Sequence, residues 1–498
     1  MTEQIVRKVV IAGGGTAGWS TAAALGKLLG PLLDIILVES DEIATIGVGE
    51  STVPTARTFH HLLGIDEREF MRETQSTYKL AISFEDWARI GDRYIHSFGT
   101  LGKSSWMGDF QHFWLEAARQ GFGGAIGDYC LEFRAAEEHR FAGPESVKMN
   151  HAFHLDAGLY ARFLRRFSEG HGVKRIEGRI ERVEQDPESG FLTALVLASG
   201  ERIAGDLFID CTGFRALLIE QTLQTGFEDW LHWLPTNSAL PIQTKATGPA
   251  VPYTRAIAHE AGWLWKIPLQ HRLGNGLVFA SDFMSDEAAH HRRDAMIEGE
   301  VLRAQPMIRF RAGRRRQAWN KNVVAMGLAS GFIEPLESTS IHLMQVAVTR
   351  LAQLFPFTGF HQASIDRYNA RSRDELENVR DFIILHYHQS ERDDSDFWRY
   401  VRTMAIPDSL AARIALFRED GHAYQGPDEL FRVDSWVQVL LGQRLPPRGY
   451  HALARLMPPA QLREALGDLK ANIARAVARM PGHQDYLDRE IHAPAAAE

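Results

Sequence analysis

A glycine-rich turn close to the amino terminus constrains the fold of this chain more than any other feature. The apolar run Lys8–Ala12 leads directly into Gly13–Gly18, GGGTAG, which has the spacing G-x-G-x-x-G. In a strand–turn–helix with this spacing, Gly13 allows the tight turn, Gly15 lets a pyrophosphate approach the backbone, and Gly18 lets the helix pack closely on the strand. The phosphates then lie at the helix N-terminus, where backbone N–H groups lack intrahelical partners.

An acid completes this pattern. The apolar run Ile35–Val38 ends in Glu39, about twenty residues after the turn, where an acid accepts hydrogen bonds from a ribose. A lone G-x-G-x-x-G is weak evidence, but strand, helix and acid together predict a nucleotide-binding α/β module. An acid at this position is compatible with FAD or NAD and disfavours a 2′-phosphate.

Composition and charge limit the class of protein. The 498 residues are 45% hydrophobic, which allows a large core and predicts two or three packed modules. Lys and Arg number 55 against 63 Asp and Glu, and the net charge of −8 argues against nucleic-acid binding. The one dense basic run, Arg309–Arg316, has no aromatic ladder, so we expect a solvated strand edge or a neighbour of cofactor phosphates.

Cysteine usage and hydropathy indicate a cytoplasmic enzyme. The two cysteines, Cys130 and Cys211, are too few for a disulfide framework or a Cys-rich metal site, so we expect a reducing compartment and no metal. No uncharged apolar stretch of about 18 residues is present, and we expect no membrane span.

Periodicity divides the chain into regions of different predicted secondary structure. From the amino terminus these are a βαβ unit to about residue 55 with a glycine-rich connection over 45–54, helices over 57–90, strands over 173–211, a β-rich middle over about 235–325, and helices from Leu343 onward. Lys79 falls toward the end of the first helical region. The Ala-rich tail, 493–498, is expected to fray.

Glu337, Lys79 and the pair Trp263 and Trp265 indicate a catalytic site only when they are considered together. Glu337 is followed by a hydroxyl cluster and an apolar helical run, so it is either a catalytic base or an acid favoured at a helix N-terminus. Lys79 alone would be a solvated lysine at a helix end. Trp263 and Trp265 alone would be alternate residues of a half-buried strand.

Together these motifs resemble the flavin-dependent halogenases of the tryptophan-halogenase type, which are built on the flavin monooxygenase fold. The motifs are GGGTAGW (Gly13–Trp19), TIGVGEST (Thr45–Thr52), STYKL with Lys79, DLFIDCTGFR (Asp206–Arg215), the W-x-W-x-I-P signature formed by Trp263, Trp265, Ile267 and Pro268, and EPLEST (Glu334–Thr339). The W-x-W-x-I-P match is the most specific, and in the family its tryptophans lie near the route between flavin and substrate.

The resemblance implies the fold class and domains. It implies an α/β fold with an FAD-binding, Rossmann-like module of the GR2 or flavin monooxygenase type. That module is expected over 1–342, interrupted by a β-rich, substrate-side insertion at about 215–325, and 343–498 is expected to be a mostly helical, substrate-side region. The residues expected to bind FAD are Gly13, Gly15, Thr16, Ala17, Gly18, Glu39, Gly49, Glu50, Ser51, Ile180, Leu328 and Ile341.

The resemblance also implies FADH2- and O2-dependent halogenation through hypohalous acid. Lys79 would guide that acid, either by donating a hydrogen bond or as an N-haloamine; we favour the hydrogen bond, because a reference pKa of about 10.4 makes the ammonium the default form. Glu337 would take the ring proton from the substrate. Chloride or bromide would bind the backbone N–H groups of Thr339 and Ser340. The tryptophan halogenases have glycine after the threonine, so Ser340 would reshape the halide site and leaves the halide preference open.

The substrate end departs from the enzymes for free tryptophan. His96-Ser97-Phe98-Gly99 resembles the family's His-Pro-Phe-Gly, so His96 and Phe98 are expected to flank an aromatic ring. The segment Asp428–Gln438 lacks the paired tyrosines typical of those enzymes, and we expect an indole-like or other electron-rich aromatic substrate. Trp436 is either a wall of that site or a core residue.

The motifs also predict a protein partner and leave two alternative functions open. With one dinucleotide fingerprint committed to FAD, a separate NAD(P)H-dependent flavin reductase is expected to supply FADH2. The rivals are a self-sufficient FAD-dependent aromatic monooxygenase and a non-catalytic nucleotide-binding protein. The sequence leaves open whether the chain forms a homodimer.

Overall fold

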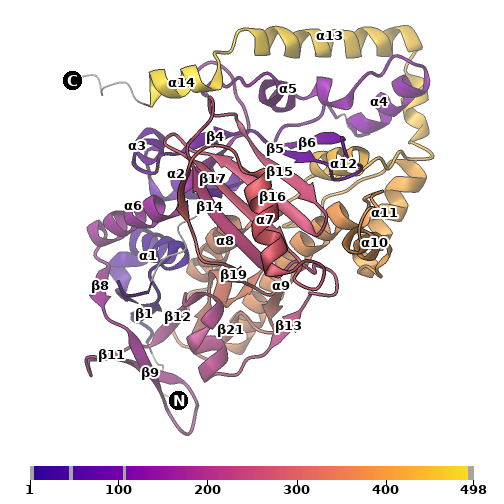
Figure 1. Ribbon diagram of the computed structural model, residues 1–498. Coiled ribbons are helices and arrows are strands. Elements are labelled where there is room, and N and C mark those ends of the chain that lie inside the picture. The colour runs from indigo at the N-terminus through magenta and orange to yellow at the C-terminus, as the bar shows by residue number, and fades with distance from the viewer. Residues whose placement is uncertain (1–4, 44–48, 105–107, 492–498) are drawn as a thin grey trace. The chain divides into compact units, whose positions relative to one another are not determined.

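The computed structural model describes residues 5–43, 49–104 and 108–491, so the tail 493–498 and residues 45–48 of the TIGVGEST motif lie outside the described residues. The chain forms two compact units, each built from three segments (Figure 1). The first unit comprises residues 1–76, 155–237 and 309–377, and the second comprises 77–154, 238–308 and 378–498. The division at residues 342 and 343 stays a prediction.

A mainly parallel sheet is the centre of the first unit. Its order is β21 (Trp319–Asn320), β22 (Val323–Ala325), β12 (Leu207–Asp210), β1 (Lys8–Ala12), β2 (Asp34–Glu39) and β8 (Lys174–Glu177), with only β21 antiparallel to its neighbour. Ala12 is in register with Val38 and Asp210, so three strands end beside the glycine turn, where Rossmann-like folds bind nucleotides.

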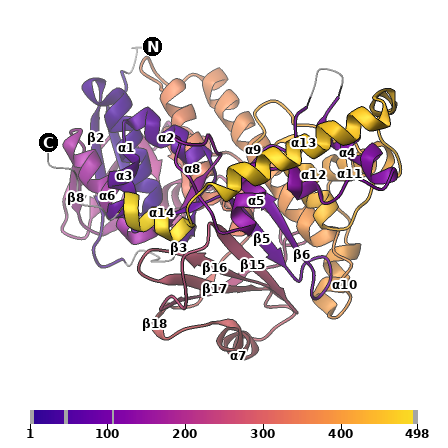
Figure 2. The ribbon, with the colours of Figure 1, turned by 90° about the horizontal axis from the view of Figure 1, so that it is seen from above.

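Helices and a second sheet cover this sheet. The helix α1 (Thr16–Leu29) contacts both α6 (Ala157–Gly170) and α8 (Ser340–Gln353), and α1 lies beside α6 in Figure 2. The small antiparallel sheet of β9 (Ile180–Gln185), β10 (Leu192–Leu197) and β11 (Arg202–Ala204) packs its apolar side chains against β1, β2 and β12. These elements form the predicted Rossmann-like module.

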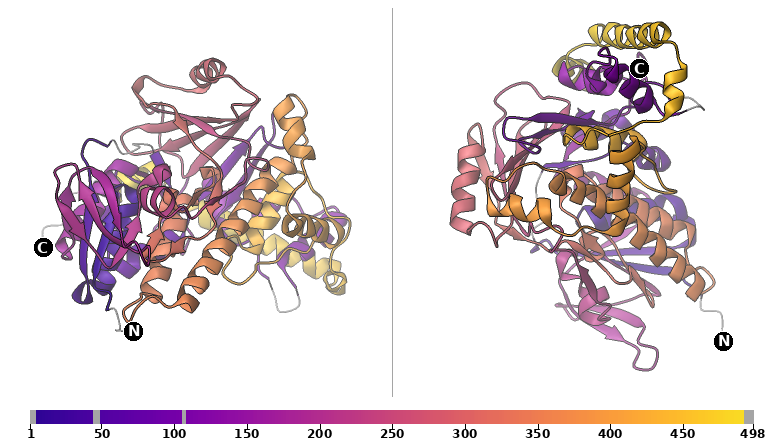
Figure 3. Two further views of the ribbon diagram at one scale, coloured as in Figure 1. Left: turned by 90° about the horizontal axis from the view of Figure 1, so that it is seen from below. Right: turned by 90° about the vertical axis from the view of Figure 1, so that its right-hand side faces the viewer.

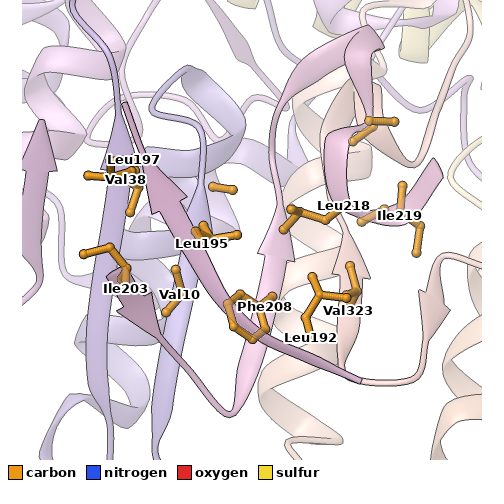
Figure 4. Close-up of a cluster of buried hydrophobic side chains, with 14 residues drawn as sticks. Val10, Val38, Leu192, Leu195, Leu197, Ile203, Phe208, Leu218, Ile219 and Val323 are labelled. Carbon is orange, nitrogen blue, oxygen red and sulfur yellow. The ribbon is translucent and has the colours of Figure 1, made fainter. Parts of the chain in front are cut away.

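Figure 4 shows the hydrophobic cluster between these two sheets. Leu195 and Ile203 of the small sheet pack against Val10, Val38 and Phe208 of the large one, and all five side chains are buried. Removing each such side chain from water contributes roughly 1.5–3 kcal/mol. The cluster therefore fixes the strands whose ends carry the glycine turn and Glu39.

The second unit contains a larger, mainly antiparallel sheet. Its path is β18 (Val301–Ala304), β14 (Ser238–Thr244), β17 (Leu273–Phe279), β16 (Gly262–Pro268), β15 (Tyr253–His259), β5 (Ala81–Glu85) and β6 (Arg93–Ser97), and only β15 and β5 are parallel. All seven residues of β16 are buried. The strand that Trp263 and Trp265 alone would indicate is therefore present, but it is fully buried and not half-buried, because β16 is an interior strand of this sheet.

The C-terminal region is mostly helical, as predicted from residue 343 onward. The described helices of the second unit are α4 (Phe110–Arg119), α5 (Leu131–Glu137), α7 (Asp286–Met296), α10 (Asp396–Thr403), α11 (Asp408–Asp420), α12 (Val433–Gly442), α13 (Pro459–Ala478) and α14 (His483–Glu490). α7 interrupts the predicted β-rich middle and contacts β14 and β17, and α13 contacts α4 and α5 (Figure 3). α9 (Gln362–His388) contributes to both units.

The prediction of helices over 57–90 is correct only for its first part. The helices α2 (Thr55–Leu63) and α3 (Glu67–Glu73) are followed by β4 (Thr77–Lys79) and β5. β-Branched and aromatic residues such as Thr77, Tyr78, Ile82 and Phe84 favour strands. Both faces of these strands are buried, so no alternation of polar and apolar residues marked them.

The basic run Arg309–Arg316 lies partly in the edge strand β19 (Ile308–Arg309) and partly in a central strand. β20 (Gly313–Arg315) is the middle strand of a three-stranded sheet, between β13 (Phe227–Asp229) and β23 (Gly331–Phe332). Its charges are matched by acids: Arg311 lies 2.9 Å from Asp229, Arg314 lies 2.7 Å from Glu228, and Arg315 lies 2.7 Å from Glu220. The expected solvated edge is therefore wrong for Arg314 and Arg315, whereas Arg309, Arg311 and Arg316 are exposed. The alternative, a neighbour of the cofactor phosphates, stays a prediction.

Within the described residues, every helix is too short or too polar to cross a membrane. Cys130 and Cys211 are both buried and unbridged, as expected from their number.

Candidate active site

The glycine turn of the first unit has the geometry that a dinucleotide needs. Gly13 has a φ of +104°, and a Cβ there would lie 2.4 Å from the Cys211 carbonyl oxygen. A Cβ at Gly18 would lie 1.9 Å from the Gly13 carbonyl oxygen, whereas one at Gly15 would meet nothing within 4 Å. The backbone at Gly15 is thus open to a ligand, directly before Thr16 and Ala17 of α1.

Glu39 lies at the end of β2, beside this turn. Its carboxylate accepts hydrogen bonds from Arg175 Nε at 2.6 Å and Trp19 Nε1 at 3.4 Å. A Cβ on Gly14 would lie only 1.6 Å from Glu39 Oε2, so this glycine makes room for the acid. Arg175 and Gly14 were not identified from the sequence, because their roles depend on which strands pair: Arg175 lies opposite Leu37 in the parallel β2–β8 ladder.

The other expected FAD residues lie at several places in the same unit. Gly49, Glu50 and Ser51 form β3 (Gly49–Ser51), and desolvation raises the pKa of Glu50 to about 7. Ile180 begins β9 and packs against the hydrophobic cluster of Figure 4, Leu328 is half-buried after β22, and Ile341 is buried in the first turn of α8.

The segment from Glu334 to Ser340 forms a tight, buried connection before α8. A 3-10 turn over Pro335–Glu337 is followed by Ser338 in the left-handed region, with a φ of +62°, and Ser51 Oγ lies 2.5 Å from Ser338 Oγ. The Glu337 side chain is fully buried. α8 begins at Ser340 and has no acid in its first turn, so the interpretation of Glu337 as a helix-capping acid does not hold.

The N-terminus of α8 presents hydrogen-bond donors in a buried setting. Thr339 is the N-cap residue and Ser340 the first helical residue, and the first N–H groups of a helix have no intrahelical partner. Among the described residues, none hydrogen-bonds the buried Thr339 hydroxyl. Such a site favours an anion. Within the same helix, His342 Nδ1 lies 2.8 Å from Thr55 Oγ1, which ties α8 to α2.

Lys79 lies in the second unit, in β4, and its side chain is fully buried. The next residue holds two neighbouring segments: Leu80 N–H donates to the Pro252 carbonyl at 2.7 Å, and the Leu80 carbonyl accepts from Phe98 N–H at 2.9 Å. Lys79 Nζ consequently lies 5.2 Å from the centroid of the Phe98 ring, within range of a cation–π interaction. The alternative of a solvated lysine, which would apply to Lys79 taken alone, is thus excluded.

The substrate residues predicted from the sequence belong to one aromatic cluster. The His96 ring centroid lies 6.5 Å from that of Phe98 and 5.6 Å from that of Phe382. Trp436 packs edge-on against Phe382 at 4.9 Å, and Phe431 stacks on Phe382 at 3.7 Å. Phe382 and Phe431 were not singled out from the sequence, since Phe382 lies in an ordinary apolar helical stretch. The cluster brings His96, Phe98 and Trp436 together.

A glutamine, Gln438, connects the strand that carries His96 and Phe98 with the helix that carries Trp436. Gln438 Oε1 accepts from Ser97 N–H at 3.0 Å and from Ser97 Oγ at 2.8 Å, while Gln438 Nε2 donates to the Ser97 carbonyl at 3.2 Å. Ser97 lies between His96 and Phe98, and Gln438 lies two residues after Trp436. A proline at position 97 would have no N–H to donate. Gln438 therefore couples the strand with His96 to the helix with Trp436.

The two tryptophans of the W-x-W-x-I-P signature lie side by side in β16, with ring centroids 6.1 Å apart. Both are buried, and so is Ile267. Pro268 ends the strand, and its carbonyl accepts a hydrogen bond of 2.7 Å from Thr77 Oγ1 in β4. The signature is therefore in hydrogen-bond contact with the strand that carries Lys79.

The predicted residues thus form two groups. The first unit carries the dinucleotide turn, Glu337 and the donors at Thr339 and Ser340, and these residues fit a bound dinucleotide and an anion. The second unit carries Lys79 and the aromatic cluster. A buried ammonium beside aromatic rings can hold and polarise a small polar reagent.

Comparisons with known proteins identify the family. The family model for tryptophan halogenases matches residues 8–459. The chain is 35% identical to tryptophan 6-halogenase ThaL from Streptomyces albogriseolus, over 98% of this chain and 99% of that protein. It is 52% identical to the structure of Xcc4156, a flavin-dependent halogenase from Xanthomonas campestris, with a TM-score of 0.97 and coverage of 99% and 100%. It is 43% identical to that of BrvH, a flavin-dependent halogenase from Brevundimonas sp. BAL3, with a TM-score of 0.93 and coverage of 97% and 99%.

The family match covers most of the chain, and the glycine turn, Glu39 and the open backbone at Gly15 fit its FAD cofactor. The chain therefore belongs to the tryptophan halogenase family and is a flavin-dependent halogenase.

Proposed function

We propose that this enzyme halogenates an electron-rich, indole-like aromatic compound with hypohalous acid that Lys79 guides. The observation that carries this proposal is the fully buried Lys79 amino group beside the ring of Phe98, which in turn belongs to the aromatic cluster around His96. The alternatives predicted from the sequence, a monooxygenase and a non-catalytic protein, give no role to this lysine.

The first unit supplies the FAD and halide sites. Gly13, Gly15 and Gly18 shape the phosphate turn, and Glu39 accepts hydrogen bonds from the ribose. When bound there, reduced FAD would activate O2, the oxidant that converts halide to hypohalous acid. Chloride or bromide binds the N–H groups of Thr339 and Ser340, and the Thr339 hydroxyl, which has no hydrogen-bond partner among the described residues, is a further donor.

Lys79 and Glu337 divide the proton transfers. The Lys79 ammonium donates a hydrogen bond to the oxygen of hypohalous acid, which makes the halogen more electrophilic and the oxygen a better leaving group. The ring carbon forms its bond to the halogen while the oxygen–halogen bond breaks, and the departing hydroxide takes a proton from Lys79 and leaves as water. The proton then released from the ring balances the one that Lys79 gives. Glu337, as base, takes the proton from that ring carbon, which restores aromaticity.

The substrate is proposed from the aromatic cluster. ThaL is named a tryptophan halogenase, but the segment Asp428–Gln438 lacks paired tyrosines for an amino-acid head group. His96, Phe98 and Trp436 supply aromatic surfaces to an indole-like ring. FADH2 is supplied by a separate NAD(P)H-dependent flavin reductase.

Removal of the Lys79 ammonium tests the proposal. Lys79→Ala is compared with Lys174→Ala, which removes an exposed lysine. Each protein is given reduced FAD, O2, bromide and indole, and products are identified by the bromine isotope pattern. We expect Lys79→Ala to lose brominated product and to keep consuming reduced FAD, and Lys174→Ala to match the wild type. A hydroxylated product from the wild type, or wild-type bromination by Lys79→Ala, refutes the proposal.

A further inference from the structure

The strand that carries Lys79 is held by a side-chain network that the reaction itself does not use. Thr77 lies two residues before Lys79 in β4, and side chains two apart in a strand share a face. In the antiparallel ladder with β7 (Ala152–Asp156), Thr77 lies opposite His154 and Lys79 opposite Ala152. Thr77, Lys79 and His154 are all fully buried.

Three hydrogen bonds connect Thr77 of β4 with the strands β7, β15 and β16. Thr77 Oγ1 donates to the Pro268 carbonyl at 2.7 Å and lies 3.0 Å from His154 Nδ1. His154 Nε2 lies 3.0 Å from Thr254 Oγ1 in β15. The chain of contacts therefore runs from β15 through β7 and β4 to the last residue of the W-x-W-x-I-P signature.

The donors in this network can be assigned by counting protons. The one hydroxyl proton of Thr77 is used on the Pro268 carbonyl, which can only accept, so Thr77 Oγ1 must accept from His154 Nδ1–H. A neutral histidine protonated at Nδ1 has an acceptor at Nε2, and Thr254 donates to it. One neutral tautomer of His154 satisfies every contact.

The neutral form also suits the surroundings. Burial, and next to it the charge of Lys79, lower the pKa of His154 well below its usual value. An imidazolium at His154 would place a second positive charge near Lys79 and would leave Nε2 without an acceptor role. The network therefore holds His154 in its neutral form beside Lys79.

We propose that Thr77 and His154 are positioning residues that brace the Lys79 strand against the Pro268 carbonyl, so that the W-x-W-x-I-P signature fixes the position of Lys79. The inference rests on the proposed role of Lys79. The strand is then held on both sides of the lysine, by Thr77 before it and by the backbone bonds of Leu80 to Pro252 and Phe98 after it. A rigid lysine matters because a reagent displaced by about 1 Å reacts up to about 100-fold more slowly.

Thr77→Val tests the brace, because valine has the shape of threonine but neither donates nor accepts. Thr77→Ser, which retains the hydroxyl, is the matched control. Brominated indole, reduced-FAD consumption and free hypobromous acid, captured by a 1,3-diketone trap, are measured together. We expect Thr77→Val to lose about tenfold in brominated product with unchanged FAD consumption and more trapped reagent, and Thr77→Ser to stay close to the wild type.

His154 provides a second and independent pair of variants. His154→Asn retains a donor amide close to the Nδ1 position, whereas His154→Leu retains none. We expect more bromination from the asparagine variant at equal melting temperature. If His154→Asn and His154→Leu give equal amounts of brominated indole, or if Thr77→Val brominates at the wild-type level, the proposed brace is wrong.

A double variant separates failure of the brace from failure of the proposed function. Adding Thr77→Val to Lys79→Ala should change neither FAD consumption nor trapped reagent further, since the residue to be positioned is gone. If the double variant consumes less reduced FAD or releases less trapped reagent than Lys79→Ala, Thr77 has a general structural role and the proposed brace is wrong. If Lys79→Ala alone retains bromination, the proposed function fails; if only Lys79→Ala loses bromination, the brace alone fails.

Discussion

Four buried histidines predict that the enzyme loses stability in mild acid. Burial lowers the pKa of His60, His259, His342 and His483 from 6.5 to about 4 in each case. Two of these rings have hydrogen-bond partners within the folded protein. His60 Nε2 lies 2.9 Å from the Tyr160 hydroxyl, and His483 Nδ1 donates to the Ala250 carbonyl at 2.8 Å.

The sign follows from which state binds protons. Between pH 6.5 and pH 4 the unfolded chain protonates these histidines and the folded chain does not, so the free energy of unfolding falls as the pH falls. At pH 5 each histidine costs about 2 kcal/mol relative to pH 7, from about 1.4 kcal/mol per unit of pH below 6.5. Glu50 acts in the opposite sense: its pKa is raised to about 7, so the folded state binds the extra proton and regains about 2 kcal/mol.

The buried His154 adds a loss of the same sign. The four histidines and Glu50 together lower the free energy of unfolding by about 6 kcal/mol between pH 7 and pH 5. With an unfolding entropy of about 2.1 cal/mol/K per residue, this corresponds to a melting temperature lower by about 6 °C. The measurement is a thermal melt by circular dichroism at both pH values and constant ionic strength.

A matched pair of variants assigns the effect to burial. His483→Asn retains a donor toward Ala250 but cannot be protonated, and it should reduce the pH-dependent loss by about 2 kcal/mol. His361→Gln replaces an exposed histidine and should leave the loss unchanged. A melting temperature that is equal at pH 5 and pH 7, or one that rises in acid, would refute the reasoning.

Three further changes test individual residues of the two groups. Gly14→Ala would place a Cβ 1.6 Å from Glu39 Oε2, so we expect FAD affinity to fall by about tenfold or more in a fluorescence titration, while Gly467→Ala, at an open helical position, should leave it unchanged. Glu337→Gln should lose halogenation and keep near-normal FAD binding; loss of both would contradict a role as base. Gln438→Leu removes three hydrogen bonds to Ser97, and we expect a several-fold higher KM for indole with FAD consumption retained, whereas an unchanged KM would exclude Gln438 from substrate positioning.

Local patterns predicted the parts of the fold that are local in origin. The turn at Gly13, the acid at Glu39 and the C-terminal helices follow from spacing and periodicity, and the structure has all three. Lys79 was misplaced on a helix, because a strand buried on both faces shows no alternation of polar and apolar residues. The strand at Trp263 is present but fully buried and not half-buried, since burial depends on what covers a sheet.

Long-range partners left no signal in the sequence. Arg175 reaches Glu39 only because β8 pairs with β2, and Gln438 reaches Ser97 only because α12 lies beside β6. No local rule connects residues more than a hundred positions apart. Residue types and the family resemblance were enough to predict Lys79, Glu337 and Trp436 as candidates. The residues that they contact could be identified only from the structure.

The burial of Lys79 explains why its strand needs so many fixed contacts. An ammonium loses several kcal/mol on leaving water, so a lysine on a mobile segment would turn its long side chain back toward solvent. A short strand pinned through Thr77 on one side and Leu80 on the other removes that freedom. The hydrogen bonds that secure it end on backbone carbonyls and neutral side chains, which add no competing charge. On this argument, the W-x-W-x-I-P signature contributes through the Pro268 carbonyl as well as through its tryptophans.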